Sequence, residues 1–289
     1  MLVLLSFVWG CTWPAMRIAL SEIPVFSMRT VSLGLGALVL LLVVGVQRRG
    51  FALRGATMWL HVLVAAILNI VSFSLLSSFA LLSSATSRVA VLSYTMPIWA
   101  ALLARPVLGE RLTRARIIAL VLCTAGLTVL IYPLADAGIP LGLVLALLTG
   151  MTWAAGTVYL KWARIAADPV TVAAWQLVIG FLVVVVCLPF VEGSLHLSHA
   201  HVPALIGMIF TGVIGSGLAY FLWFSAVPRL SATTASIGVL AVPLIGVIST
   251  AIVLGEYPTV TDMAGFALIF AASACVLLPS RDVAAPEPG

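Results

Sequence analysis

Charged residues are scarce in this sequence. Asp, Glu, Lys and Arg together make up 8% of the 289 residues, whereas hydrophobic residues make up 63%. A soluble domain carries about 25% charged residues. So small a charged fraction excludes a fully water-facing surface, and it predicts a chain that faces lipid over most of its area.

Motifs for nucleotide hydrolysis and for catalytic zinc are absent as well. The chain has no Gly-x-x-x-x-Gly-Lys-Ser/Thr sequence, which cradles ATP phosphates, and no His-Glu-x-x-His sequence, which binds zinc. We therefore expect no cofactor, no metal site and no catalytic residues, and hence no enzyme. Four cysteines fall within apolar segments, where we expect them to pack as small residues: Cys11, Cys123, Cys187 and Cys275.

What the sequence does contain is a series of long apolar segments separated by short polar loops. Each segment is close to the ~20 residues that an α-helix needs to cross a bilayer. The ten predicted transmembrane helices are residues 2–20, 27–46, 58–80, 86–108, 115–134, 141–162, 171–191, 203–226, 233–254 and 262–279.

Basic residues gather on one side of the membrane in this arrangement. With a cytoplasmic N-terminus, only Arg17, Arg29 and Arg88 lie near the outer side. The positive-inside rule then predicts cytoplasmic N- and C-termini in the cell inner membrane, and it explains the basic net charge without nucleic-acid binding. The basic residues of the inner loops and tail are Arg48, Arg49, Arg54, Arg105, Arg111, Arg114, Arg116, Lys161, Arg164, Arg229 and Arg281.

A pattern around Pro97 recurs around Pro243. In the first copy, an apolar run leads from Pro97 to Gly109-Glu110, and in the second an apolar run of the same length leads from Pro243 to Gly255-Glu256. Three residues that recur at fixed spacing indicate an internal duplication. Duplicated membrane units are most often transporters.

The two copies are predicted to have opposite orientations in the membrane. The first repeat, residues 1–134, and the second, residues 141–280, hold five helices each, and five is odd. Residues 281–289 are predicted to form a cytoplasmic tail. The fold class is therefore an all-α membrane protein, with ten transmembrane helices arranged as two inverted five-helix repeats. Such repeats can exchange their shapes, which opens a central cavity to each side of the membrane in turn.

Several motifs together resemble one family. The pattern Trp9-Gly10-x-x-Trp13-x-x-x-Arg17, Arg29 at the start of the second helix, and the two Pro…Gly-Glu units resemble the ten-helix EamA branch of the drug/metabolite transporter superfamily. The resemblance covers nearly the whole chain, although it also leads us to expect a longer segment before Trp9. It implies export of amino acids and related metabolites, as in the aromatic amino acid exporters. It also implies a cavity lined by helices 1, 3, 4, 6, 8 and 9, with helices 5 and 10 as scaffold.

Acidic residues are missing from the middle of every predicted helix. A carboxylate embedded in the membrane is the usual proton-coupling group of carriers, so this absence favours uniport or exchange. Proton coupling through Glu110 or Glu256 is the alternative, although Gly-Glu more simply marks the end of a helix. The acidic residues lie at helix ends, in loops or in the tail: Glu22, Glu110, Asp136, Asp168, Glu192, Glu256, Asp262, Asp282 and Glu287.

Aromatic and amide side chains near the middle of the helices are the candidate solute-binding residues. A cavity for a neutral or zwitterionic solute needs aromatic walls and a few hydrogen-bonding groups. Aromatic residues also collect at membrane interfaces, and an unpaired buried amide costs roughly 2–7 kcal/mol, so a neighbouring helix could satisfy Asn69 instead. The predicted binding residues are Trp13, Asn69, Tyr94, Trp99, Trp153, Tyr159 and Tyr220.

Two further groups have both a functional and a structural interpretation. Pro97 and Pro243 weaken their helices locally and are predicted hinges, the alternative being static kinks. Arg17, Arg29 and Arg88 could attract a solute carboxylate, but extension to lipid headgroups is the interpretation that we favour.

Taken together, the sequence predicts a carrier that exports small organic metabolites by alternating access, with amino acids, including aromatic ones, as the solutes. Its partners would be the solute and the lipid bilayer, and a monomer would suffice to enclose a cavity. The alternatives are a drug or nucleotide-sugar carrier, a membrane-embedded enzyme and a structural subunit. A sugar nucleotide would need basic residues deep in the cavity, and an enzyme would need a catalytic constellation there.

Overall fold

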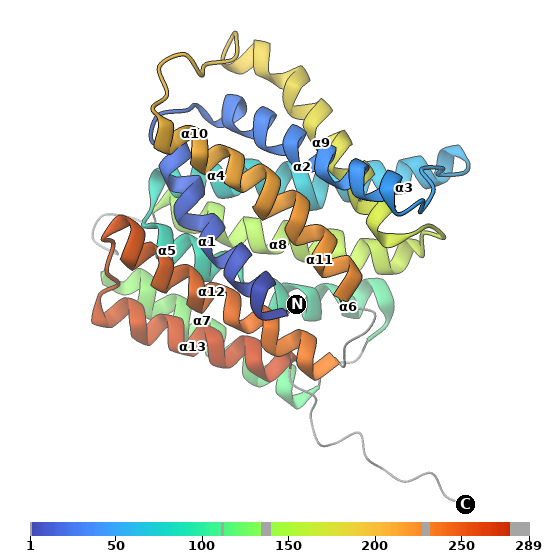
Figure 1. The fold of residues 1–289 in the computed structure, drawn as a ribbon. Helices are drawn as coiled ribbons and strands as arrows, with labels where there is room; N and C mark the ends of the chain where they lie inside the picture. The colour runs from blue at the N-terminus through green and yellow to red at the C-terminus, as the bar shows by residue number, and fades with distance from the viewer. Residues whose placement is uncertain (1, 111–112, 134–139, 227–231, 278–289) are drawn as a thin grey trace, which may run out of the picture.

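The computed structural model describes residues 2–110, 113–133, 140–226 and 232–277. Their regular structure is helical, and the ten predicted spans are confirmed (Figure 1). Within the described residues, nine of the ten spans are long and apolar enough to cross a membrane. The remaining span, which is the ninth along the chain, contributes the shorter apolar stretch Leu240–Leu254. The predicted tail, 281–289, lies outside the described residues, as do Arg111, Arg229 and Asp136.

The first five spans run through eight helical elements. They are α1 (Leu2–Leu20), α2 (Val25–Val46), α3 (Ala56–Ala66) with η1 (Ile67–Ser72) and α4 (Phe73–Ser83), α5 (Thr86–Ser93) with α6 (Met96–Leu108), and α7 (Arg114–Ile131). The other five spans are α8 (Leu141–Ala163), α9 (Pro169–Val191), α10 (Val202–Ile209) with η3 (Phe210–Leu218) and α11 (Ala219–Ala226), α12 (Ala232–Leu254), and α13 (Val260–Leu277).

Each span packs against a span of the other repeat, and the pairing is symmetric between the repeats. α2 packs along α9, and α7 packs along α13 at the opposite edge of the bundle (Figure 1). α1 packs on α12, and α8 packs on α5 and α6, which is the same pairing with the halves exchanged. Gly126 and Gly265 bring α7 and α13 together, because a methyl group on Gly126 would lie 2.9 Å from the Gly265 carbonyl oxygen. This exchange of partners is what inverted repeats predict.

The third span of each repeat contains a π-helical segment, η1 in the first and η3 in the second. In η3, a methyl group on Gly212 would lie 2.6 Å from the Ser32 carbonyl oxygen, and one on Gly215 would lie 2.7 Å from Thr12 Oγ1. These glycines therefore let α1 and α2 approach η3 closely. Wide turns of this kind often occur at functional sites, and both segments face the interior of the bundle.

The fourth span was expected to be one helix, but it is broken between α5 and α6. Tyr94 and Thr95 separate the two helices, and Pro97 lies in the first turn of α6. Proline lacks the N–H that would bond to the Ser93 carbonyl, and its ring crowds that carbonyl. Pro243, the related residue, lies inside α12, which continues through it. One duplicated proline thus breaks a helix and the other does not.

The two ends of the bundle differ in charge. The carboxylate end carries Glu22, Glu192, Glu256 and Asp262, where α2, α5, α10 and α13 begin. The basic end carries most of the described arginines together with Lys161, Glu110 and Asp168, where α9 begins.

Candidate solute-binding cavity

A cavity of about 490 Å³ lies between the two repeats. This volume falls within the ~300–1,000 Å³ typical of small-molecule sites. Its wall comes from α1, η1, α4, α6, α8, η3 and α11, as the resemblance implied for spans 1, 3, 4, 6 and 8. α2 and α9 also contribute, through residues such as Arg29 and Gln176, whereas no described residue of α12 lines it.

Aromatic side chains form much of the wall. Trp13 lies edge-to-face against Tyr94, with ring centroids 6.5 Å apart, and Trp153 lies 6.0 Å from Tyr220. Phe73 packs 5.0 Å from Trp153 and so extends the same wall. Four predicted binding residues, from four different spans, therefore lie around one cavity. Such a wall suits an aromatic or apolar solute body and offers ring faces to a cation.

Asn69 also lines the cavity, but a neighbouring helix satisfies part of its amide. Its Nδ2 donates to Gln176 Oε1 at 3.3 Å, and both side chains are buried. A methyl group on Gly156 would lie 2.0 Å from Asn69 Oδ1, so this glycine makes room for the amide. Asn69 Oδ1 has no hydrogen-bond partner among the described residues. The residue thus joins η1 to α9 at the cavity wall.

Trp99 and Tyr159 were predicted to bind solute, but neither lies in the wall. Trp99 Nε1 donates to Thr95 Oγ1 at 3.1 Å, because α6 starts anew after the break and turns Met96, Pro97 and Ala100 toward the cavity instead. The Tyr159 hydroxyl bonds to His61 Nδ1 at 2.8 Å, on the face of α8 that meets α3.

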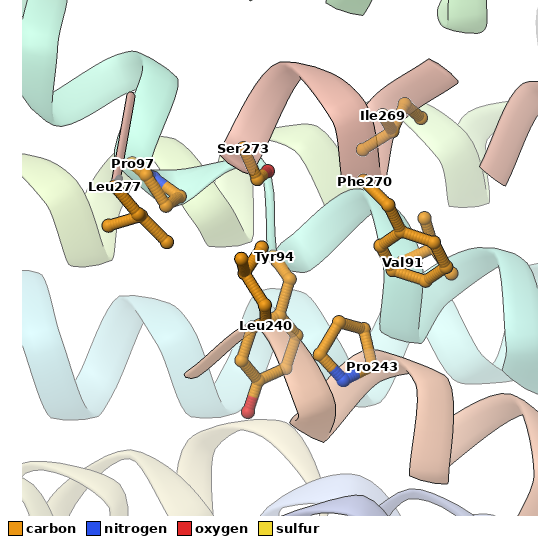
Figure 2. A pocket seen from close by; sticks show the side chains of 9 residues that line it. All are labelled: Val91, Tyr94, Pro97, Leu240, Pro243, Ile269, Phe270, Ser273 and Leu277. Carbon is orange, nitrogen blue, oxygen red and sulfur yellow. The ribbon is translucent and has the colours of Figure 1, made fainter. Parts of the chain in front are cut away.

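Pro97 and Pro243 line a second, much smaller gap together. Its volume is about 10 Å³, and Val91, Tyr94, Leu240 and residues of α13 complete its wall (Figure 2). Figure 2 shows Tyr94 beside Pro243, with Pro97 on the other side of the gap. A gap of this size holds about one water molecule. The two duplicated prolines therefore meet beside the larger cavity, which Tyr94 and Pro97 also line.

Arg29 lines the cavity, whereas the sequence analysis favoured a position at the membrane surface. The interpretation that it extends to lipid headgroups is wrong, because Arg29 is 4% exposed and its guanidinium bonds to Ser77 and Ser78 of α4. Arg17 donates to the Leu81 carbonyl, and Arg88 pairs with Asp262 at 2.6 Å. The serines that hold Arg29 come from another span, so the position of Arg29 along its own helix gives no sign of them.

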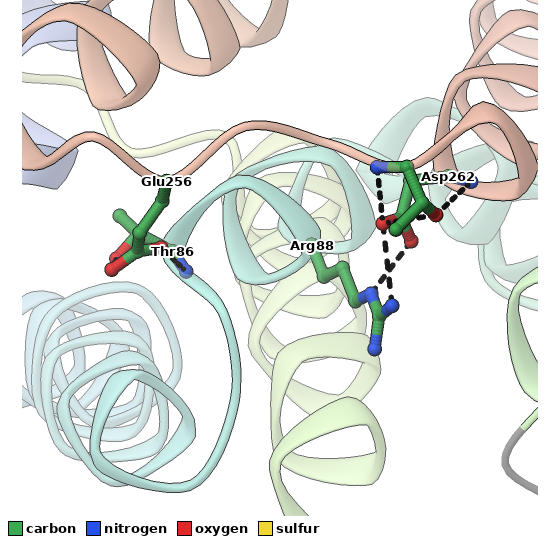
Figure 3. Close-up of polar contacts among 5 residues, drawn as sticks. Thr86, Arg88, Glu256 and Asp262 are labelled. Carbon is green, nitrogen blue, oxygen red and sulfur yellow. Dashed lines mark hydrogen bonds and ion pairs between the residues drawn. The ribbon is translucent and has the colours of Figure 1, made fainter.

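Carboxylates at the carboxylate end join the two repeats. Glu256, beyond the end of α12, accepts the Thr86 backbone N–H at the start of α5 at 2.9 Å (Figure 3). Glu192, at the end of α9, accepts the backbone N–H groups of Phe26 and Ser27 at the start of α2, both at 2.8 Å. Because the N-terminus of a helix carries a partial positive charge and free N–H groups, these contacts stabilise both partners.

Two more carboxylates join the repeats at the carboxylate end. Asp262 of α13 pairs with Arg88 of α5 and also accepts the Thr259 backbone N–H at 3.0 Å (Figure 3). Glu22 accepts the backbone N–H of His201, just before α10, at 2.6 Å. That N–H and the His201 ring hold the pKa of Glu22 below its usual value. Each of these four described acids therefore makes a contact that crosses from one repeat to the other.

The basic end is joined mainly by side chains. Glu110 accepts hydrogen bonds from Lys161 Nζ and Arg116 Nη2, both at 2.8 Å, and these bonds lower the pKa of the Glu110 carboxyl. Arg49 pairs with Asp168 at 2.9 Å. The wall of the cavity reaches toward this end, through Phe224 and through Leu277, the last residue of α13.

Toward the carboxylate end, the cavity wall stops well inside the bundle. Its outermost residues there are Met16, Arg29 and Ser74. Each lies at least a helical turn from the nearest end of its span. The cavity is therefore closed toward the carboxylate end, where the contacts between repeats gather, and extends toward the basic end.

These features define a class of protein: a ten-helix membrane protein with two inverted repeats around a central cavity. The model of the EamA-like transporter family matches residues 1–132 and again residues 140–278. The chain belongs to this family. Family membership indicates a membrane transporter rather than an enzyme.

The chain is also similar to individual proteins. It is 22% identical over 271 residues to the uncharacterized transporter YoaV of Bacillus subtilis, and the aligned region covers 93% of this chain and 92% of YoaV. It is 27% identical over 270 residues to the uncharacterized transporter YvbV of the same organism, which covers 93% and 88%. It is 29% identical to the protein PecM of Dickeya dadantii, over 74% of this chain and 72% of PecM. A solved crystal structure with a TM-score of 0.67 and 18% identity covers 98% of both chains and so shares the fold.

Proposed function

We propose that this transporter exports small organic metabolites, with amino acids, including aromatic ones, as its solutes. The aromatic cavity wall carries this proposal. Trp13, Tyr94, Trp153 and Tyr220 surround a volume suited to an amino acid with a large side chain. Asn69 and Gln176 supply polar groups at the same wall. The class of solute and the direction of export follow the family resemblance and the chemistry of this wall.

Alternating access would proceed by exchange of the two repeat conformations. In the present state, Glu256 bonds to the start of α5 and the carboxylate end is closed. In the opposite state, Glu110 would leave Lys161 and bond to the start of α12, which is the repeat-related helix start. Pro97 and Pro243, which meet at one small gap, would be the hinges. With the basic end in the cytoplasm of the cell, the present state would face inward.

Transport would be uniport or exchange. Asp262 is the described acid most deeply inserted in a span, and it is already paired with Arg88. An acid that carries protons across the membrane must be able to change its protonation as solute binds. Since one chain encloses the whole cavity, a monomer would be the functional unit.

Counterflow in proteoliposomes tests the proposal. Purified protein would be reconstituted with an internal load of unlabelled phenylalanine, and uptake of labelled phenylalanine, threonine and methionine would be followed without an ion gradient. Transient accumulation is the expected result. If accumulation requires a pH gradient or occurs only with drugs or sugar nucleotides, uncoupled amino acid transport is wrong and the alternative carriers gain support. Trp153→Ala should reduce phenylalanine counterflow more than Trp162→Ala, since Trp162 lies outside the cavity wall.

A further inference from the structure

Arg29 is the only charged side chain among the described residues of the cavity wall. It lies in the second turn of α2 and is 4% exposed. A cation inside the hydrocarbon region is costly, and such residues are usually paired or functional. The group that neutralises the charge of Arg29 therefore determines which class of solute the cavity can bind.

Neutral groups hold one side of the Arg29 guanidinium. Nε donates to Ser78 Oγ at 2.7 Å, and Nη2 contacts Ser77 Oγ at 3.0 Å and the sulfur of Met16 at 2.6 Å. Both serine hydroxyls donate in turn to the Ser74 carbonyl, so their lone pairs are turned toward the arginine. This arrangement orients the guanidinium but leaves its charge without a counterion. None of the described carboxylates forms an ion pair with Arg29.

The other terminal nitrogen of Arg29 faces open space. Within the described residues, Nη1 forms no hydrogen bond. It is also not among the fully enclosed polar atoms that lack a partner, which are Thr30 Oγ1, Asn69 Oδ1, Ser93 Oγ, Ser225 Oγ and Thr250 Oγ1. Because the residue as a whole is almost completely buried and lines the cavity, the space that Nη1 faces is the cavity itself.

The neighbouring arginines of this end differ from Arg29. Arg88 has its counterion in Asp262, and Arg17 donates to a backbone carbonyl outside the cavity. Of these three arginines, Arg29 alone combines burial, a fixed orientation, a missing counterion and an N–H group directed into the cavity. An oxyanion would complete this site, since a guanidinium binds one by charge-assisted hydrogen bonds.

We propose that Arg29 binds a single carboxylate group of the solute. One cation and no acid in the described wall match one negative charge, whereas a phosphate dianion would need further basic groups. The aromatic residues Trp13, Tyr94, Trp153 and Tyr220 would receive the rest of the molecule. This inference rests on the proposed carrier function, and it narrows the solute to a monocarboxylate or zwitterion with an apolar or aromatic body.

A set of four probes tests the carboxylate preference. Binding to the purified full chain in detergent would be followed by tryptophan fluorescence, because Trp9, Trp13 and Trp153 line the cavity. The probes are phenylalanine, 3-phenylpropionate, phenethylamine, which lacks the carboxylate, and phenyl phosphate. We expect both carboxylates to bind more tightly than phenethylamine and phenyl phosphate. Equal binding of phenethylamine and phenylalanine would overturn the inference, and tighter binding of phenyl phosphate would replace the carboxylate by a phosphate group.

Three variants separate recognition from folding. Arg29→Gln should weaken carboxylate binding by roughly 10- to 100-fold, the loss expected for a hydrogen bond to a charged group. It should not weaken binding of phenethylamine, which is a cation at neutral pH and is repelled by Arg29. Arg29→Lys keeps the charge without the planar fork and should lose less. Arg17→Gln, which removes a basic residue outside the wall, is the matched control and should bind as the wild type does. A loss that affects all probes equally would overturn the inference.

Transport assays distinguish this inference from the proposed function. Carboxylate-selective binding that depends on Arg29, without any counterflow, would contradict the carrier proposal and leave the binding site intact. Counterflow of phenylalanine that Arg29→Gln leaves unchanged would contradict the binding site and leave the carrier proposal intact.

Discussion

The two ends of the bundle hold the repeats together by different chemistry. At the carboxylate end, Glu22, Glu192 and Glu256 each accept backbone N–H groups from the start of a helix in the other repeat. At the basic end, Glu110 bonds instead to the side chains of Lys161 and Arg116. Glu110 and Glu256 follow the duplicated prolines at the same distance, yet they make different contacts. Two equivalent residues in different environments are what an inverted repeat predicts when it occupies one of its two states.

The two ends also differ in how strongly their contacts hold the repeats together. A backbone N–H is fixed by its helix, so a carboxylate that accepts it gains a hydrogen bond and a favourable dipole without ordering a second side chain. The Lys161 side chain is 67% exposed, and exposed ion pairs contribute little. We therefore expect the carboxylate end to determine the stability of the present state.

The largest effect should come from Arg88, which pairs with Asp262 between α5 and α13. Arg88→Gln would leave the buried Asp262 carboxylate with only its Thr259 contacts. We expect a loss of about 2–3 kcal/mol in unfolding free energy, somewhat less than for a fully buried pair, because Arg88 is partly exposed. Unfolding in mixed micelles measures this change. The double variant Arg88→Gln with Asp262→Asn should recover part of the loss, and no recovery would show that the two residues act independently.

The second effect concerns Glu192, which bonds to the start of α2. Glu192→Ala removes three hydrogen bonds, two to backbone N–H groups and one to the Ser27 hydroxyl. The expected destabilisation is about 1–2 kcal/mol, as for the loss of a helix cap. The same unfolding measurement applies. Glu192→Gln, which keeps the shape and part of the acceptor capacity, should lose less than Glu192→Ala.

The third effect compares the two duplicated glutamates directly. Glu256→Gln weakens the contact with Thr86 and should open the carboxylate end more often, at a cost of about 1 kcal/mol to the present state. A cysteine introduced at Thr12, in the cavity wall of a variant without native cysteines, would then react faster with a reagent added at the carboxylate end. Glu110→Gln is the matched control, and the proposed exchange predicts that it does not accelerate this reaction. Equal acceleration by both variants would contradict the difference between the two ends.

How far the sequence predicts this molecule depends on the range of the interactions involved. The ten spans and their duplication were predictable, because the length of an apolar run and the Pro…Gly-Glu spacing are local properties. The depth of a residue in the membrane also follows from its position along its own apolar segment. This is why Trp13, Tyr94, Trp153 and Tyr220 could be placed near the centre. Rotation about the helix axis is not local. Tyr159 turns toward α3, and the break after Tyr94 turns Trp99 away from the cavity.

Arg29 shows the same limit for a charged residue. Its place in the second turn of a helix is typical of a side chain that extends to the membrane surface. The structure turns it inward because Ser77 and Ser78 of α4 and Met16 of α1 offer acceptors there. Those partners belong to other spans, so no pattern within α2 could have indicated them. The sequence analysis also treated Pro97 and Pro243 alike, whereas the helix breaks before Pro97 and continues through Pro243.

The smallest effect is a pH dependence of the basic end. Hydrogen bonds from Lys161 and Arg116 lower the pKa of Glu110 below its ordinary value of 4.5. A lowered pKa in the folded protein means that the ionised carboxylate is stabilised by folding. The contribution is therefore fully present at neutral pH and is lost as the pH falls below 4.5 and through the lowered pKa. Because the Lys161 side chain is largely exposed, this contribution should stay below about 0.5 kcal/mol.

The difference in unfolding free energy between the wild type and Glu110→Gln should shrink toward zero at acidic pH. If that difference is instead large and independent of pH, Glu110 stabilises the basic end by packing rather than by charge, and the contrast with Glu256 would have to be explained by shape.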